Sequence, residues 1–154
     1  RKAVKIAKDN NVMFSFDTNI RPALWKSLKE ATNTLLGFIE QANVLLTDMN
    51  DTRILLGNVK LNDAIKQYLS MGVNIVVMKL GAKGAIAASK NEYVEAKGYT
   101  IPIADPIGAG DALAGRFLTN ILKGYTLERS LKRAVAAGLL VVTVRGSRKY
   151  SRRG

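Results

Sequence analysis

The chain contains no cysteine and no histidine among its 154 residues. Without cysteine it can form no disulfide bond and has no thiolate nucleophile. Without histidine it can form neither a Ser-His catalytic triad nor a histidine metal site. Any metal ion must therefore be bound by oxygen ligands, a set that suits Mg²⁺.

Long apolar runs are also missing. No segment approaches the roughly 18 or more apolar residues of a membrane span, and no charged and then apolar leader opens the chain. We therefore expect a cytoplasmic protein with no membrane partner. The composition, 47% hydrophobic and 23% charged, is ordinary for a soluble globular protein. A chain of this length predicts a single domain, residues 1–154, with a sizeable core.

Acidic residues are few, 12 against 24 lysines and arginines, which gives a formal net charge of +12. A basic protein attracts nucleic acid, and equally small phosphorylated or acidic metabolites. The charges are spread along the chain as on an ordinary solvated surface, apart from one dense cluster near the C-terminus: Arg145, Arg148, Lys149, Arg152 and Arg153. Binding of nucleic acid through that cluster is the less favoured alternative.

Hydrophobic periodicity indicates alternating strands and helices. Such an order predicts an α/β layered sandwich with a mostly parallel sheet and a small antiparallel insertion. Ligands then bind at the carboxyl ends of the parallel strands, where Asp17, Thr47, Lys79 and the loop 105–111 fall. The expected strands are 12–16, 42–46 and 73–78, with a short pair around 85–95. Residues 1–11 are expected to form the end of a helix, and residues 24–39 one long helix or two short ones. The other expected helices are 49–56, 61–71, 111–122 and 127–144.

The stretch Asp105-Pro-Ile-Gly-Ala-Gly-Asp111 joins an apolar segment, 99–104, to a helical pattern, so a strand is expected to lead into a helix there. Gly108, Ala109 and Gly110 carry little or no side chain, and backbone N–H groups at a helix start favour an anion. Asp111 would then act as a helix cap or as a general base. A plain Gly-rich turn capped by aspartate is an equally good interpretation of the residues alone.

A second string, Asp17-Thr-Asn-Ile-Arg-Pro-Ala-Leu-Trp25, places Asn19 and Arg21 in a loop after a strand. Arginine can bind a phosphate or carboxylate with two parallel hydrogen bonds. The alternative is a loop arginine that packs over Trp25. A third string, Thr47-Asp-Met-Asn-Asp51, is by itself typical of a helix N-cap with acidic residues in the first turn.

These strings together resemble the ribokinase-like (PfkB) family of sugar kinases, whose signature reads D-[TP]-x-G-A-G-D before a long helix. The resemblance implies that Asp111 is the catalytic base and that the amides of Gly108, Ala109 and Gly110 form an anion hole. The segment 17–25 is similar to the D-x-N-x-R-P-x-L-W segment of 2-keto-3-deoxygluconate kinases. This similarity assigns Asn19 and Arg21 to an acid sugar and the transferred phosphate.

The same resemblance implies ATP and Mg²⁺ as cofactors. Where the family usually reads N-x-x-E, this chain has Asp48 and Asp51, which would organise Mg²⁺ through water. Lys79-Leu-Gly-Ala-Lys-Gly84 resembles the turn that borders the nucleotide; a plain hairpin turn is the alternative. The predicted ATP-binding residues come from this turn and from the loop 105–111: Lys79, Gly81, Lys83, Gly84, Gly108 and Gly110.

The resemblance covers about the C-terminal half of the family. The N-terminal half, which supplies the first strands and the lid over the sugar in relatives, has no counterpart in these residues. An uncovered sheet edge is prone to association, so we expect either a homo-oligomer or association with such a half. The predicted activity is ATP-dependent phosphorylation of a sugar hydroxyl. A catalytically inactive nucleotide-binding segment is the alternative.

Overall fold

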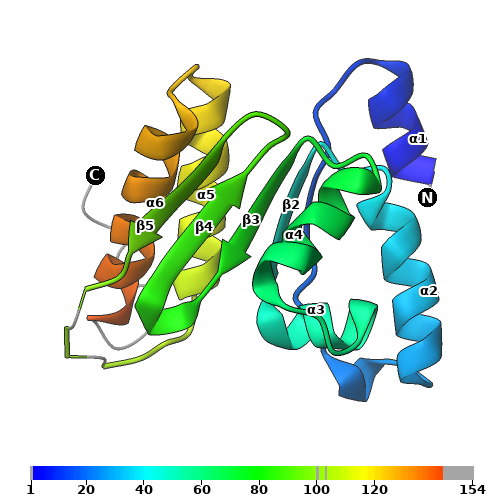
Figure 1. Ribbon diagram of the computed structural model, residues 1–154, viewed down its shortest axis with the longest axis horizontal. Helices are drawn as coiled ribbons and strands as arrows, with labels where there is room; N and C mark the ends of the chain where they lie inside the picture. Colours follow the sequence, from blue (N-terminus) through cyan, green and yellow to red (C-terminus); the bar gives the residue numbers. More distant parts are fainter. Residues whose placement is uncertain (1, 100, 103, 144–154) are drawn as a thin grey trace. The chain divides into compact units, whose positions relative to one another are not determined.

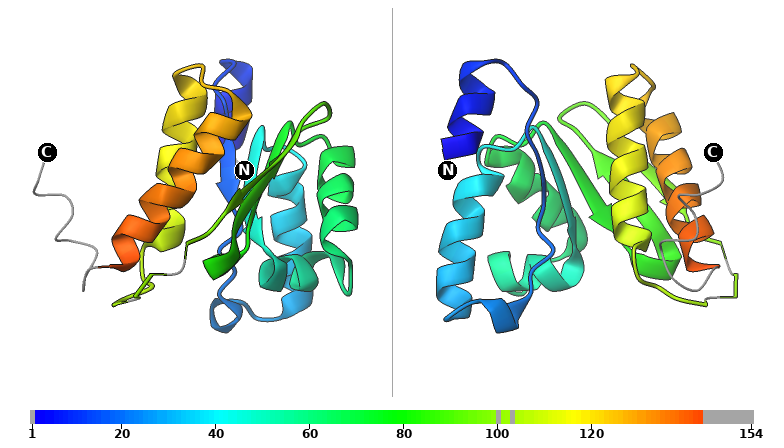
Figure 2. Two further views of the ribbon diagram at one scale, coloured as in Figure 1. Left: turned by 60° about the vertical axis from the view of Figure 1, so that its left-hand side comes forward. Right: turned by 180° about the vertical axis from the view of Figure 1, so that it is seen from behind.

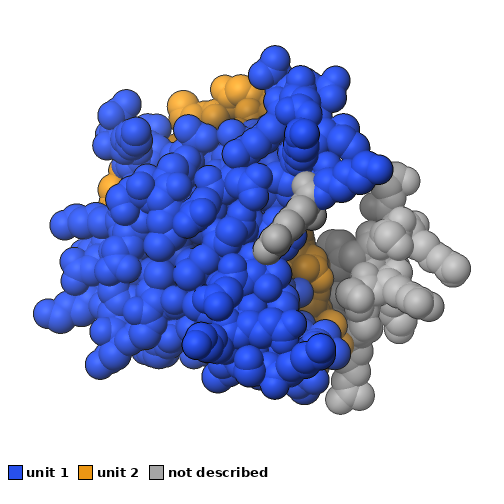
Figure 3. Space-filling view, turned by 90° about the vertical axis from the view of Figure 1, so that its right-hand side faces the viewer, with its two compact units in different colours: residues 1–78, 88–92 blue, residues 79–87, 93–154 orange. Residues whose placement is uncertain are grey.

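The computed structural model describes residues 2–99, 101–102 and 104–143. The chain divides into two compact units, coloured separately in Figure 3. Unit 1 comprises residues 1–78 and 88–92, and unit 2 comprises residues 79–87 and 93–154. The basic cluster 145–153 lies outside the described residues.

Unit 1 contains strands β1 (Ser15–Asp17), β2 (Val44–Asp48) and β3 (Ile75–Lys79), which neighbour one another in that order; Lys79, the last residue of β3, belongs to unit 2. β1 and β2 are parallel, with Phe16 opposite Leu45, as the sequence predicts. The remaining elements of this unit are labelled in Figure 1 except the 3₁₀ turn: α1 (Lys2–Asp9), η1 (Pro22–Leu24), α2 (Leu28–Ile39), α3 (Met49–Leu56) and α4 (Leu61–Ser70).

Helix boundaries in unit 1 follow local capping chemistry. α2 begins after Ser27, whose hydroxyl accepts the N–H of Glu30 at 3.1 Å, so the long apolar run 24–39 is a short 3₁₀ turn followed by one helix. α3 has the predicted bounds, because Asp48 caps its start and Gly57, at φ 77°, ends it.

Both parallel strands differ from the prediction: β1 begins three residues later and ends one residue later, and β2 is shifted by two residues. The expected strand 12–16 is β1 at Ser15–Asp17, and the expected strand 42–46 is β2 at Val44–Asp48. Val12 and Met13 are apolar yet 57% and 37% exposed. Apolar residues indicate where a chain can be buried, whereas hydrogen bonds to the neighbouring strand set its limits, and this difference produced the error.

The core of unit 1 is built on β2 and β3, which present nearly continuous buried apolar residues. Such runs are typical of parallel strands covered on both faces. Tyr68 of α4 is fully buried against this core, and its hydroxyl lies 3.3 Å from Oγ1 of Thr52. Burial raises the pKa of the Tyr68 phenol, so the phenol stays protonated at neutral pH and can donate this hydrogen bond.

Unit 2 contains the 3₁₀ turn η2 (Gly81–Lys83), the neighbouring strands β4 (Gly84–Ala88) and β5 (Tyr93–Lys97), and helices α5 (Ala109–Leu122) and α6 (Leu127–Val142); Ala88, the last residue of β4, belongs to unit 1. The predicted small insertion is this β4–β5 hairpin. α5 and α6 lie side by side, and α6 also packs on β5 (Figure 2). No described helix has both the length and the apolar character needed to cross a membrane.

The prediction of a strand before the loop 105–111 is wrong, because the described residues of that segment form no strand. Instead, the N–H groups of Ala104 and Asp105 donate to the carbonyl oxygen of Val142, at 2.7 and 3.3 Å. Because these donors bond to the end of α6, they are not available to a neighbouring strand. α5 begins at Ala109, two residues earlier than predicted, and the last predicted residue of α6, Val144, lies outside the described residues.

Candidate functional site

The turn before α5 has a left-handed residue at its centre. Gly108 has φ 85° and is the N-cap of α5, a conformation that glycine adopts without steric cost. The N–H of Ile107 donates to Oδ1 of Asp105 at 2.9 Å, and the carbonyl oxygen of Gly108 accepts the N–H of Ala112 at 2.9 Å. Asp105 therefore shapes the entry to the turn.

The N–H groups of this turn are largely available to a ligand. Within the described part of the chain, the N–H groups of Gly108, Gly110 and Asp111 have no hydrogen-bond partner. The N–H of Ala109 lies 3.4 Å from the carbonyl oxygen of Pro106, which is a long hydrogen bond. Asp111 is exposed and is the third residue of α5. Unpaired donors at a helix start favour an anion.

Lys79 borders the same turn. A methyl group built on Gly110 would lie 3.8 Å from Nζ of Lys79, so a cationic side chain and the open N–H groups come together within unit 2. A methyl group on Gly138 of α6 would lie 3.0 Å from the carbonyl oxygen of Ala109. The glycine thus lets α6 pack closely on the first turn of α5.

The predicted nucleotide-binding turn has a structural role of its own. Gly81 and Gly84 have φ 61° and 102°, and Lys83 is exposed. A methyl group on Gly84 would lie 2.0 Å from the carbonyl oxygen of Ala96. Packing of the β4–β5 hairpin therefore accounts for this glycine, whatever else it contacts.

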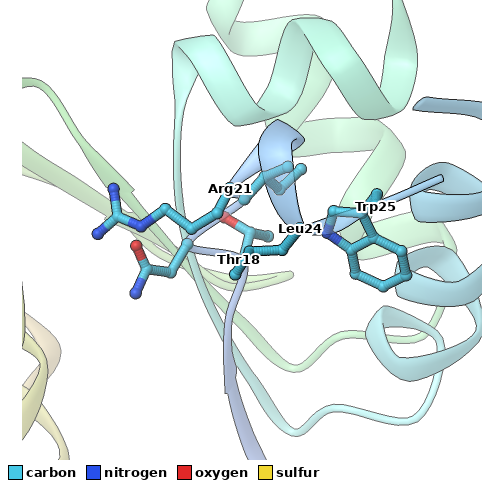
Figure 4. Close-up of a pocket in the computed structure, with 6 residues that line it drawn as sticks. Thr18, Arg21, Leu24 and Trp25 are labelled. Carbon is cyan, nitrogen blue, oxygen red and sulfur yellow. The ribbon is translucent and has the colours of Figure 1, made fainter. Parts of the chain in front are cut away.

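In unit 1, the loop after β1 surrounds a pocket of about 290 Å³ that is lined by Thr18, Asn19, Ile20, Arg21, Leu24 and Trp25. Asn19 and Arg21 are exposed. Figure 4 shows the Arg21 side chain extending away from the indole of Trp25. The alternative in which Arg21 packs over Trp25 is therefore not what the structure shows, and the guanidinium is open to a ligand.

Asn19 has a positive φ, 35°, which is uncommon for a residue with a side chain. Conformations of this kind cost about 1–3 kcal/mol and persist where the surroundings hold them. Here the surroundings are Asp51, whose Oδ2 accepts hydrogen bonds from the hydroxyl of Thr18 and the N–H of Ile20. Thr18 had no predicted role of its own, and the one sequence signal for it was its place beside Asn19.

Asp48 has the capping role that the sequence left open. Its Oδ1 accepts the N–H groups of Asn50 and Asp51 at 2.7 and 2.9 Å. We expect Asp48→Ala to lower the free energy of unfolding by about 0.5–2 kcal/mol, because two N–H groups of α3 lose their acceptor. Asp48→Asn keeps a capping oxygen and serves as the control in a urea denaturation experiment. Equal stability of all three proteins would contradict the capping role.

The described residues contain no group of three or more acidic side chains that could bind a metal. Asp48 and Asp51 lie on α3 and its cap, and each uses one oxygen in hydrogen bonds. Mg²⁺ is often bound by one or two carboxylates together with phosphate oxygens and water. The acidic pair offers oxygen ligands of the kind that such a partial site uses.

A family model described as pfkB family carbohydrate kinase matches residues 1–152. The 2-dehydro-3-deoxygluconokinase of Thermoproteus tenax is 44% identical over 133 residues, which cover 86% of this chain and 41% of the relative. The 5-dehydro-2-deoxygluconokinase of Listeria monocytogenes is 32% identical over 149 residues, covering 95% and 46%. The chain thus spans less than half the length of either relative.

Solved structures that resemble this chain are also assigned as sugar kinases. An E. coli protein assigned as ribokinase II, crystallised with ATP and Mg²⁺, superposes with a TM-score of 0.88 at 32% identity, covering 96% of this chain and 48% of that one. The fructokinase of Vibrio cholerae, with fructose, ADP and calcium, gives 0.85 at 26% identity, covering 95% and 49%. The predicted ribokinase-like α/β fold is confirmed.

Proposed function

Because the chain belongs to the pfkB family of carbohydrate kinases, we propose that it takes part in ATP-dependent phosphorylation of a sugar hydroxyl, with 2-keto-3-deoxygluconate or a related acid sugar as acceptor. One observation carries the proposal: open N–H groups and an exposed carboxylate, Asp111, share the first turn of α5. The N–H groups suit a phosphoryl group, and the carboxylate suits the acceptor hydroxyl.

In the proposed reaction Asp111 accepts the proton of the sugar hydroxyl as its oxygen attacks the terminal phosphorus of ATP. The bond from that phosphorus to the bridging oxygen breaks, and ADP leaves with the electron pair. The N–H groups of Gly108, Ala109 and Gly110 stabilise negative charge on the transferred group. Lys79, beside Gly110, adds a positive charge at the same turn.

The nucleotide is proposed to contact Lys79, Gly81, Lys83, Gly84 and the turn 108–110. Mg²⁺, when bound with ATP, would neutralise phosphate charge, and Asp48 and Asp51 would hold it through water. The anion-binding character of the turn supports the ATP assignment. The E. coli neighbour, which was crystallised with ATP and Mg²⁺, supports it independently.

Asn19 and Arg21 are proposed to bind the acidic end of the sugar or a phosphate. Two observations support this role. The guanidinium is exposed beside a pocket, and the Thermoproteus relative is named for an acid-sugar kinase activity. A guanidinium binds a carboxylate through charge-assisted hydrogen bonds that a neutral sugar cannot provide.

A coupled ADP-release assay with the full-length protein tests the function. We expect turnover with 2-keto-3-deoxygluconate above that with 5-keto-2-deoxygluconate or fructose. Arg21→Ala should raise the KM for the acid sugar by about 10- to 100-fold, the effect of losing a charge-assisted hydrogen bond. Arg53→Ala, which removes an exposed arginine of α3, is the matched control and should leave KM unchanged.

The alternative, a nucleotide-binding segment without activity of its own, is favoured by the short span of the chain relative to the proteins it matches. The same assay separates the two. ATP binding without ADP release for any sugar supports the alternative. Preference for fructose with an unchanged Arg21→Ala variant would contradict the acid-sugar assignment alone.

A further inference from the structure

A single carboxylate oxygen holds both neighbours of Asn19. Oδ2 of Asp51 lies 2.5 Å from the hydroxyl oxygen of Thr18 and 3.1 Å from the backbone nitrogen of Ile20. Asn19, between them, has the positive φ of 35°. The two hydrogen bonds fix the chain on either side of the one residue whose conformation is unfavourable.

The hydrogen bonds are shielded from water. Thr18, Ile20 and Asp51 are 5%, 7% and 8% exposed, respectively. A buried carboxylate is costly unless donors satisfy it, so these two donors also stabilise Asp51. Alternate residues of the loop, Asn19 and Arg21, remain exposed. The inner side of the loop is therefore anchored while its outer side chains face solvent.

The direction of the Thr18 hydrogen bond is fixed by its partners. The hydroxyl oxygens of Thr18 and Thr47 lie 3.0 Å apart. An ionised carboxylate can only accept, and a hydroxyl has one proton. Thr18 therefore donates to Asp51, and its oxygen can accept from Thr47, whose hydroxyl also lies 3.4 Å from the carbonyl oxygen of Asp48. Thr47 is fully buried near the end of β2, so the chain of bonds ties the loop to the rigid strand.

We propose that Asp51 is a positioning residue, which holds Thr18 and Ile20 so that Asn19 and Arg21 are presented to the acidic group of the sugar. The proposal rests on the proposed function for the identity of the ligand. The hydrogen bonds that define it involve the protein alone. The positioning role is distinct from any role of Asp51 in organising Mg²⁺. In the absence of Mg²⁺ a metal role has no effect, whereas the positioning role remains.

The first test measures the loop without any ligand. Hydrogen exchange at the backbone amide of Ile20 is followed in wild type, Asp51→Ala, Thr18→Val and Thr18→Ser. We expect exchange to become about 10- to 100-fold faster in Asp51→Ala, as expected when a hydrogen bond to a charged group is lost. Thr18→Val, which keeps the shape of the side chain, should change in the same direction. Thr18→Ser restores the hydroxyl and should restore slow exchange.

The second test measures the affinity of the loop for the sugar. Trp25, the only tryptophan of the chain, lines the pocket, so its fluorescence reports binding of 2-keto-3-deoxygluconate directly. The titration uses the full-length protein with EDTA and no Mg²⁺. We expect Thr18→Val and Asp51→Ala to weaken binding by about tenfold or more, with Thr18→Ser close to wild type. In turnover with Mg²⁺, Thr18→Val should raise the KM for the sugar while the KM for ATP stays within about twofold.

The outcomes separate the proposals. Unchanged Ile20 exchange in Asp51→Ala and Thr18→Val overturns the positioning role, whatever the sugar assays give. Normal sugar affinity without Mg²⁺, combined with a higher Mg²⁺ requirement in turnover, also overturns it in favour of a metal role. Fast exchange with weakened binding that Thr18→Ser rescues supports it. If wild type neither binds nor phosphorylates an acid sugar, the proposed function fails, and presentation to that sugar fails with it, while the exchange data still decide the loop contact.

Discussion

Turnover of the full-length protein should fall by about 10²- to 10⁴-fold in Asp111→Asn, the usual contribution of a positioned general base. The amide keeps the size of the side chain but is a poor proton acceptor. Asp111 is exposed at the first turn of α5, beside N–H groups that lack partners in the described chain. Because the asparagine leaves those N–H groups in place, ATP affinity measured by equilibrium titration should be retained.

Asp63 provides a matched control for the competing structural role. Like Asp111, it is exposed and is the third residue of a helix, in this case α4. An acidic residue in the first turn interacts with the helix dipole, worth about 0.3–1 kcal/mol. Both Asp→Asn variants should therefore lose similar stability, while only Asp111→Asn loses turnover. Equal turnover in the two variants would remove Asp111 from the catalytic role.

The second large effect concerns stability. Gly84→Ala should lower the free energy of unfolding by more than about 3 kcal/mol. Its methyl group would lie 2.0 Å from the carbonyl oxygen of Ala96 and 2.5 Å from the nitrogen of Gly98. Both are backbone atoms, so no side chain can move aside. The φ of 102° adds strain for any residue with a Cβ.

The variant Gly124→Ala separates the cost of backbone strain at a positive φ from the cost of steric overlap by the added methyl group. Gly124 also has a positive φ, 73°, but nothing lies within 4 Å of the position its methyl group would take. This control should lose only about 1–2 kcal/mol, the cost of the left-handed conformation. Urea denaturation followed by circular dichroism measures both. A Gly84→Ala protein of normal stability that no longer binds ATP would show that the glycine serves the nucleotide and not the hairpin.

Several local features could be predicted because their causes lie within a few residues. The bounds of α3 follow from Asp48 at the cap and Gly57 after the last turn. The parallel pairing of β1 and β2 follows from apolar runs separated by a helix. A helix start at the Gly-rich turn also follows from a short string, although α5 begins at Ala109 and not at Asp111.

The strand assignments were less accurate, and the cause lies in pairing between distant segments. The residues before the G-A-G-D turn are apolar, as in a strand, yet Ala104 and Asp105 bond to Val142 at the end of α6. A similar limit applies to Asp51. Its place in a segment that resembles the family's N-x-x-E suggested a metal site, whereas its contacts with Thr18 and Ile20 come from a loop about 30 residues away.

The sequence by itself determined the chemistry available to this protein: no thiol or imidazole, an aspartate behind three small residues, and an arginine in the loop after a strand. Only the tertiary structure decided which of these groups are open and which are engaged. It left the N–H groups of Gly108 and Gly110 without partners among the described residues, and it placed Lys79 beside them. The physical reason is that residue type sets what a side chain can donate or accept, while its actual partner depends on segments that only folding brings together.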